Sequence, residues 1–253
     1  MKPIQIYKCK DFKEKYYKNK GHLFNLPARL LLVGKSQFSG KSSMILNLLC
    51  QDDERLYKND FDNIFIFSNS IDTDTKIKNI IKNQSIPEEN LNKDYDEDMI
   101  QAIYDLTEEE YRQAIEAGEK PPHTLIILDD IGDKSKSRGK NNIIDEIYTR
   151  GRHINLSIFI LLQKYTMASM TQRENASGLI IWDTSDKQLE TISDEHSIFP
   201  KKDFKKMFRK VTESPYSYMI INYSNNKKNR YLNKNFLPVG PCGKVKDAGC
   251  DCP

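Results

Sequence analysis

The chain has 253 residues, of which 38% are hydrophobic and 30% are charged, with a formal net charge of +3. This length suits one large α/β domain with short appendages. No segment approaches the ~20 consecutive apolar residues of a membrane span, and the N-terminus lacks the apolar core of a signal peptide. The composition therefore excludes a membrane protein and predicts a soluble globular one.

The cysteines are five in number and unevenly spaced: Cys9, Cys50, Cys242, Cys250 and Cys252. An odd count without a secretion signal indicates reduced thiols rather than a disulfide framework. The three tail cysteines could bind a metal, but structural zinc normally takes four ligands. We therefore favour a disordered tail over a zinc site.

Five continuous apolar runs predict buried parallel strands, because strands covered on both faces do not alternate in polarity. In chain order these runs are Arg29–Gly34, Asn63–Ser68, Thr124–Asp129, Leu156–Gln163 and Gly178–Trp182. Helical stretches between them are Lys41–Cys50, Ile71–Asn83, Glu97–Gly118 and Asn142–Arg150. Strand and helix alternate, which predicts an α/β fold with a doubly wound, mainly parallel central sheet flanked by helices.

Three further assignments complete the chain. Met99, Ile103 and Leu106 have the spacing of one apolar helix face. Residues 187–211 are expected to be helical, and Tyr216–Asn222 is expected to be a sixth strand at an edge. We expect an N-terminal arm over 1–25, one domain over 26–240 and a disordered tail over 241–253.

Local charge is uneven. Residues 8–20, 201–210 and 226–234 are basic, whereas 94–119 are largely acidic. Such runs are usually solvated faces. Three basic runs in one chain are also consistent with a polyanionic partner.

The first strand leads directly into a loop and an apolar helix, through Gly34-Lys35-Ser36-Gln37-Phe38-Ser39-Gly40-Lys41-Ser42-Ser43. Backbone N–H groups of such a loop and of the helix N-terminus face phosphates, and Gly40 lets the chain approach them without a Cβ. Lys41 brings a positive charge to the β- and γ-phosphates, and the Ser42 hydroxyl is a ligand for Mg²⁺. The segment predicts a P-loop that binds ATP and Mg²⁺ through Ser39, Gly40, Lys41, Ser42 and Ser43.

The spacing of this loop departs from the common pattern, which has four residues between its two glycines. Five residues separate Gly34 from Gly40. Either the loop has one additional residue, or Lys35 occupies the position of the first glycine.

Two acids follow the third apolar run, at Asp129 and Asp130. A buried strand delivers such carboxylates to the carboxyl edge of the sheet, where ligands bind. We expect Asp129 to hold Mg²⁺ beside Ser42, and Asp130 to orient or deprotonate the attacking water. Gln163 ends the next strand. It would lie near the two acids if that strand is between the first strand and the acid strand, where it could sense the γ-phosphate.

Three segments together resemble the FtsK–HerA superfamily of DNA-pumping ATPases, in particular its viral genome-packaging branch of poxvirus, giant-virus and virophage proteins. The segments are LLLVGKSQFSGKSSMILNLL, LIILDDIGD, and TRGRHINLSIFILLQKY followed by QREN. The resemblance covers roughly residues 22–238. It implies a RecA-like P-loop fold, with Asp129 as the metal-side acid, Asp130 as the catalytic acid and Gln163 as the sensor. Cellular members usually have Glu at the position of Asp130.

Members of this superfamily act as rings in which an arginine of a neighbouring subunit completes the active site. Arg173, Arg152 and Arg150 are the candidates here, and we favour Arg173. Arg173 follows the sensor strand in a polar segment that could face a neighbour, whereas Arg152 precedes that strand at the end opposite its own nucleotide.

The resemblance implies an ATPase that translocates double-stranded DNA, without reading its sequence, into a capsid. The expected partners are DNA, further copies of the chain in a homo-oligomeric ring, and a capsid vertex, with no membrane. The expected location is the cytoplasmic assembly site of an infected cell, with possible retention in the virion. The alternatives are a cellular DNA-pumping translocase or helicase, and a nucleotide kinase or switch.

Overall fold

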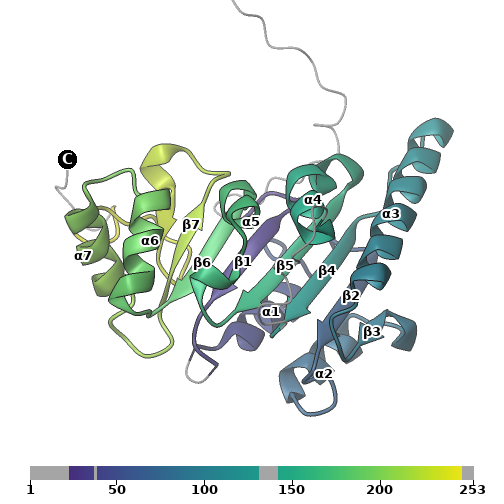
Figure 1. Cartoon of the computed structure of the whole chain (residues 1–253), viewed down its shortest axis with the longest axis horizontal. Coiled ribbons are helices and arrows are strands. Elements are labelled where there is room, and N and C mark those ends of the chain that lie inside the picture. The colour runs from purple at the N-terminus through teal and green to yellow at the C-terminus, as the bar shows by residue number, and fades with distance from the viewer. Residues whose placement is uncertain (1–22, 37–38, 131–141, 247–253) are drawn as a thin grey trace, which may run out of the picture.

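A computed structural model of the chain describes residues 23–36, 39–130 and 142–246. Its centre is an eight-stranded sheet in the order β3-β2-β4-β5-β1-β6-β7-β8 (Figure 1). The strands are β1 Arg29–Val33, β2 Asn63–Ser68, β3 Leu91–Asn92, β4 Thr124–Asp129, β5 Leu156–Leu162, β6 Gly178–Trp182, β7 Tyr218–Asn222 and β8 Tyr231–Leu232. All pairings from β3 to β6 are parallel. The predicted mainly parallel α/β fold is confirmed.

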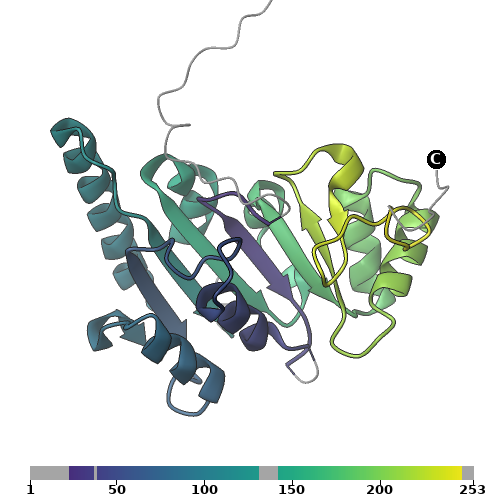
Figure 2. The same cartoon turned by 180° about the vertical axis from the view of Figure 1, so that it is seen from behind.

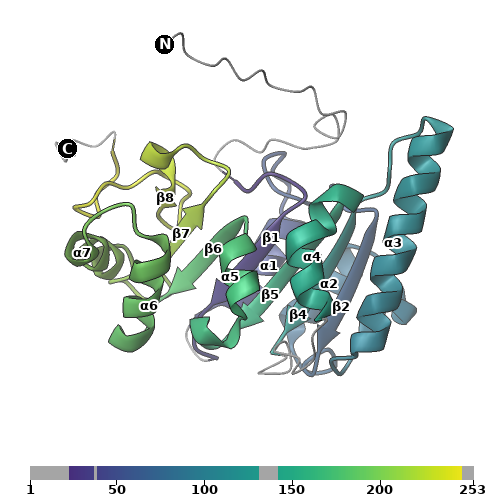
Figure 3. The ribbon, with the colours of Figure 1, turned by 45° about the horizontal axis from the view of Figure 1, so that its top comes forward.

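Helices cover both faces of the sheet. They are α1 Lys41–Cys50, α2 Thr75–Asn83, α3 Glu97–Ala117, α4 Ile143–Arg150, α5 Met170–Asn175, α6 Asp186–His196 and α7 Lys201–Val211. Apolar residues of α3, α4, α6 and α7 share one core cluster, and those of α1 and α2 share the other. Figure 2, seen from behind, shows α1 and α2 on their own face, and Figure 3 shows the opposite layer.

The central strand β5 explains why the apolar runs are continuous. Leu156, Ile158, Ile160 and Leu162 enter the first core cluster. Phe159 and Leu161 enter the second, on the other face. Because both faces of the strand are buried, every position favours an apolar side chain.

The sixth strand is not at an edge. β7 pairs antiparallel with β6 on one side and with β8 on the other. The short β8 has only two residues, so the sequence has no apolar run there that would predict a strand. The expected helical stretch 187–211 is two helices, interrupted at 197–200, because Pro200 precedes α7 and has no N–H to continue α6.

The buried face of α3 also differs from expectation. Met99 and Leu106 are exposed, at 37% and 53%. Ile100, Ile103, Tyr104 and Thr107 form the buried face instead. Ile103 belongs to both the expected and the observed buried face, and the other positions of the observed face are shifted by one residue along the helix.

Described residues just outside 26–240 also make contacts, while the domain limits themselves stay a prediction. Leu23 and Phe24 are buried, and the Leu23 carbonyl accepts a 3.0 Å hydrogen bond from Asn222 Nδ2. A bridge between Val239 and Val245 folds the chain beyond 240 into a turn. Cys250 and Cys252, on which the metal hypothesis depends, lie outside the described residues. Within the described ranges, no helix has the length and apolar character needed to cross a bilayer.

Candidate nucleotide-binding site

The three sequence motifs meet at the carboxyl edge of the sheet. β4, β5 and β1 are neighbours in that order, and their register places Asp129 opposite Leu161 and Val33 opposite Leu162. The acids after β4, Gln163 after β5 and the loop after β1 therefore lie side by side. The strand that ends before Gln163 lies between the other two, which is the condition on which Gln163 would be near the two acids.

The glycines of the loop meet different geometric demands. Gly34 N donates a 2.9 Å hydrogen bond to Leu162 O, which ties the loop to β5. A Cβ at Gly34 would lie 2.7 Å from Ser39 Cβ and 3.2 Å from Trp182 Cβ. Gly40 has a φ of 83°, in the left-handed region that favours glycine. The close approach at Gly34 favours that residue, rather than Lys35, as the first glycine of a loop with one additional residue.

The helix α1 begins without a local anion. No side chain caps it at Gly40, and its first turn has no acidic residue. Ser42 and Ser43 are half-buried, and neither hydroxyl has a hydrogen-bond partner among the described residues. The helix N-terminus and both hydroxyls are therefore available to a phosphate or a phosphate-bound cation.

The Lys41 ammonium lies inside the loop. Its Nζ donates to Gly34 O at 2.6 Å and to Lys35 O at 3.3 Å. Burial lowers the pKa of Lys41, while Asp129 and Asp130 act in the opposite direction. Removed from water and bonded to carbonyl oxygens, this cation suits an anionic ligand.

Asp129 is half-buried at the end of β4. Its Oδ2 accepts a 3.0 Å hydrogen bond from Ser68 Oγ, at the end of the neighbouring β2. Burial raises the pKa of Asp129, the Ser68 hydrogen bond lowers it and Asp130 raises it further. Hard oxygen ligands of this kind fit Mg²⁺, together with the Ser42 hydroxyl. The sequence analysis missed Ser68, although this polar residue directly follows the apolar run of β2.

Asp130 and Gln163 form a pair at the rim of the sheet. Gln163 Nε2 donates a 2.7 Å hydrogen bond to Asp130 Oδ1, and both residues are exposed. Asp130 has a φ of 53°, so its backbone is left-handed. The structure thus brings the expected acid and the expected sensor into direct contact, where solvent reaches both.

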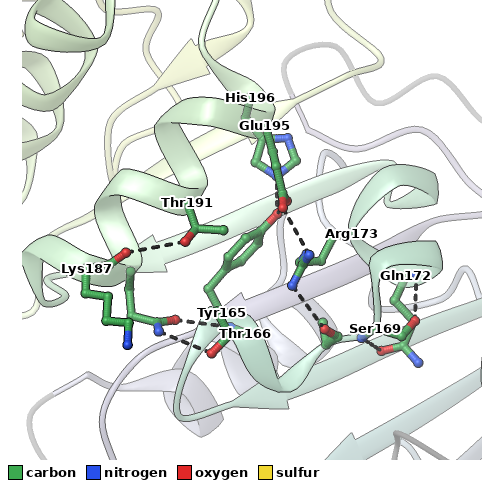
Figure 4. A network of polar contacts seen from close by, with 11 residues as sticks. Tyr165, Thr166, Ser169, Gln172, Arg173, Lys187, Thr191, Glu195 and His196 are labelled. Carbon is green, nitrogen blue, oxygen red and sulfur yellow. Dashed lines mark hydrogen bonds and ion pairs between the residues drawn. The ribbon is translucent and has the colours of Figure 1, made fainter.

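Arg173 does not face outward from its own chain. It lies in α5, where Nη2 is 3.0 Å from Glu195 Oε1 and its guanidinium is 5.3 Å from the Tyr165 ring centroid. The side chain is 16% exposed. Figure 4 shows the guanidinium between Glu195 and the chain that follows β5. The partner, Glu195, is 22 positions away, so local sequence did not reveal it.

A buried polar network surrounds this ion pair. Tyr165 contacts both Glu195 and His196 Nε2 through its hydroxyl, and Tyr223 OH contacts His196 Nδ1. One proton order satisfies every group: Tyr223 donates to His196, His196 donates to Tyr165, and Tyr165 donates to the Glu195 carboxylate. Burial, followed by Arg173 and Arg230, lowers the pKa of His196 to about 4. The network fixes the segment that begins two residues after Gln163.

Arg152 and Arg150 lie at the amino edge of the sheet. Arg150 is exposed and ion-paired with Glu146 at 2.9 Å. Arg152 lies in the short helix η4, Gly151–Ile154, immediately before β5. It is exposed and lines a cavity of about 420 Å³ with Arg29, Thr149 and Glu174. Arg152 is therefore remote from the nucleotide loop of its own chain, and it has no ion pair among the described residues.

The basic segment 201–210 coincides with α7, whose apolar face is Phe204, Met207 and Phe208. Lys201 and Lys205 both pair with Glu190 of α6, and Lys210 pairs with Glu213. Lys202 and Lys206 are exposed and have no ion pair within the described part of the chain. The basic segment 8–20 lies outside the described residues.

The sequence is similar to those of known proteins. Residues 14–233 match the family described as Poxvirus A32 protein. The chain is 28% identical over 176 residues to the DNA packaging protein OPG160 of Monkeypox virus, covering 65% of this chain and 50% of that protein. Identity to OPG160 of Vaccinia virus (strain Copenhagen) is also 28%, covering 56% of that protein. The chain thus spans about half the length of the curated relatives it matches.

A solved structure has the same fold. The genome packaging NTPase B204 from Sulfolobus turreted icosahedral virus 2, in complex with ATP-gammaS, matches with a TM-score of 0.53 at 17% identity. The match covers 81% of this chain and 95% of B204. Since the family match spans most of the sequence, the chain belongs to the Poxvirus A32 protein family.

Proposed function

We propose that this protein is an ATP-hydrolysing motor that moves double-stranded viral DNA into a capsid. The observation that carries the proposal is the Asp130–Gln163 pair beside Lys41 and Asp129, at one edge of the sheet. A phosphate-binding cation, a metal-side acid and a group that positions water are the parts that phosphoryl transfer to water requires. DNA enters from the relatives, which are DNA packaging proteins of viruses, and the capsid is our inference of the compartment that such packaging fills.

Each residue then has a distinct role. Lys41 and the N-terminus of α1 would bind the triphosphate, and Ser42 and Asp129 would hold Mg²⁺. When bound, this ion neutralises phosphate charge. Asp130 accepts the proton of the attacking water. Its Oδ1 accepts the hydrogen bond from Gln163 Nε2, so Oδ2 is left to bind the water. Through this hydrogen bond Gln163 controls the position of the Asp130 carboxylate.

The site is completed, in this proposal, by Arg152 of an adjacent subunit in a homo-oligomeric ring. An arginine finger typically contributes ~10³–10⁵ in rate. Arg152 is exposed at the edge opposite its own nucleotide loop, so head-to-tail packing would bring it to a neighbour's nucleotide. Arg173, which the sequence favoured, is already engaged by Glu195 within its own chain.

The proposal is tested by the ATPase rate with and without linear duplex DNA. We expect DNA of any base sequence to stimulate the rate. We also expect Lys41→Ala to lose turnover, because the phosphates of the bound ATP lose the main cation of the loop. An active protein that no DNA stimulates, but that phosphorylates an added nucleotide, would instead be a kinase. DNA stimulation without packaging into capsids of the source virus would indicate a translocase of the cellular kind.

A further inference from the structure

A cavity of about 490 Å³ lies beside the phosphate loop. Lys35 and Ser39 of the loop form one wall, and Trp182 with the segment 212–217 forms the other. Trp182 ends β6, whereas the acids follow β4, and β1 and β5 separate these two strands. The cavity is therefore on the opposite side of the loop from Asp130 and Gln163.

Tyr216 stands at the mouth of this cavity in a conformation that its residue type rarely adopts. Ser217 N donates a 3.1 Å hydrogen bond to Ser214 O, closing a turn with Pro215 and Tyr216 at its centre. Tyr216 has a φ of 60°, where such turns normally have glycine or asparagine. A non-glycine residue in this region is strained, and strain of this kind clusters at functional sites.

The Tyr216 ring is exposed and close to the loop. Tyr216 is 60% exposed, although it is a large aromatic residue. Its Cδ1 lies 4.0 Å from the position that a Cβ on Gly40 would occupy. The fold thus holds an aromatic face, open to solvent, immediately beside the start of α1.

The remaining walls hold a buried tryptophan and several polar groups that are already engaged. Trp182 is 4% exposed and its ring centroid is 5.0 Å from that of Tyr218. The Arg209 guanidinium is engaged by Asp183 at 2.5 Å and Asp186 at 2.6 Å. Thr212 Oγ1 donates to Phe208 O at 2.9 Å. The exposed aromatic surface of the cavity is therefore that of Tyr216. Arg209 and Thr212 are already paired, whereas the buried Trp182 Nε1 has no hydrogen-bond partner among the described residues.

We propose that this cavity binds the purine base of the nucleotide, stacked on Tyr216. The inference rests on the proposed function, which places the terminal phosphate beside Asp130 and Gln163. A triphosphate that extends from there past Lys41 brings its nucleoside out on the β6–β7 side, at Tyr216. Stacking contacts the flat face of a base and not the hydrogen-bonding groups at its edge, which distinguish one purine from another. The site therefore binds adenine and guanine nucleotides with similar affinity.

Trp182 is the only tryptophan of the chain and lines the cavity, so its fluorescence reports binding. ATP and GTP should change the emission, with affinities within ~10-fold of each other. Inorganic tripolyphosphate, which has no base, should compete with ATP. Tyr216→Gly should weaken ATP binding by ~10-fold, the order of one lost base–aromatic stack, and leave the tripolyphosphate affinity unchanged. Tyr216→Phe is the matched control and should retain ATP affinity.

Folding does not confound this test, because glycine relieves the positive φ. The melting temperature of Tyr216→Gly should stay close to that of the parent, because relief of the backbone strain offsets the greater freedom of glycine in the unfolded chain. ATP affinity unchanged in Tyr216→Gly would overturn the inference, as would a preference above ~100-fold for one purine. Parent protein that binds neither ATP nor tripolyphosphate would overturn the proposed function itself. If the parent protein binds ATP and tripolyphosphate with equal affinity, the base contributes nothing to binding. That result would overturn the proposed base site and leave the proposed function intact.

Discussion

Gln163 Nε2 lies 2.7 Å from Asp130 Oδ1, so the residue after β5 holds the second acid after β4. These positions are 33 residues apart in sequence and adjacent only because β4 and β5 pair in parallel. The hydrogen bond makes the acid and the amide one unit, and any movement of the segment after β5 displaces the acid. Two predictions separate their contributions.

Asp130→Asn is expected to bind ATP normally and to lose ~10²–10⁴ in kcat, the usual contribution of a positioned general base. Asparagine still offers an Oδ1 to Gln163 and tolerates the left-handed backbone, so the local structure should persist. Binding of a non-hydrolysable ATP analogue and steady-state turnover measure the two effects. Turnover near that of the parent would remove Asp130 from the catalytic role.

Gln163→Ala should remove most of the DNA stimulation and leave the basal rate within ~10-fold of the parent. Asp130 keeps its carboxylate in this variant, but the segment anchored by Tyr165 no longer reaches it. The measurement is the ratio of ATPase rates with and without duplex DNA. If both rates fall by the same factor, Gln163 acts in the chemical step and not in coupling.

The two arginines should behave differently in mixed rings. Lys41→Ala mixed with Arg152→Ala should regain part of the activity, because some interfaces join an intact Lys41 to an intact Arg152. Lys41→Ala mixed with Arg173→Ala should regain nothing, since Arg173 serves its own subunit. Arg173→Ala should also lower the free energy of unfolding by about 1–3 kcal/mol, because Glu195 loses its charged partner.

The reverse pattern would reassign the finger. Recovery with Arg173→Ala and not with Arg152→Ala would make Arg173 the residue that acts on a neighbour. Arg150→Ala is mixed in the same way, since its ion pair with Glu146 is exposed and contributes little to stability. Recovery in that mixture alone would make Arg150 the finger, and recovery in none of the three would contradict a shared site.

Lys202 and Lys206 lie one turn apart on α7 and should contact DNA phosphates. Reversing both to Glu is expected to weaken DNA binding and to reduce the slope of log affinity against log salt by ~2, since each phosphate contact contributes about one. Lys78→Glu with Lys82→Glu on α2 is the control, because it makes the same charge change on the opposite face. If DNA affinity falls equally in both double variants, the basic residues of α7 are only a solvated surface and not a DNA contact.

Acid should destabilise the protein through His196. Its pKa is lowered to about 4 in the folded chain against ~6.5 in an unfolded one. The unfolded state therefore binds more protons between these values, and stability falls as pH drops from ~6.5 toward 4, by up to about 3 kcal/mol. The groups that face the imidazole are Tyr165, Tyr223, Glu195, Arg173 and Arg230.

Urea unfolding at several pH values measures this loss. His196→Gln offers a donor and an acceptor but does not titrate, so its stability should depend less on pH over that range. An equal pH dependence in parent and variant would mean that other groups control acid unfolding.

The sequence predicted most of the site residues that lie at the end of a single strand. The loop, both acids and Gln163 are at the ends of apolar runs, and parallel pairing brings such ends to one edge. Relationships across the sheet were less accessible. The sequence placed β7 at an edge because β8 is too short to leave an apolar run. It left Arg173 without a partner because Glu195 comes from another helix.

Side-chain direction within helices was the weakest prediction. Met99 and Leu106 are apolar but exposed, and no local signal distinguishes them from Ile100 and Tyr104, which face the sheet. The expected strand began at Tyr216, but β7 begins at Tyr218. Tyr216 lies instead in the preceding turn, which the hydrogen bond from Ser217 N to Ser214 O closes.

The left-handed backbone at residue 130 restricts which residues can evolve there. Aspartate and asparagine enter this region more easily than longer side chains do, and of these two only aspartate can accept a proton. A change from Asp to Glu would therefore require a rearranged turn as well as one more methylene group. The left-handed main chain at residue 130 thus gives a physical reason why this chain has aspartate there, if residue 130 is the proposed proton acceptor.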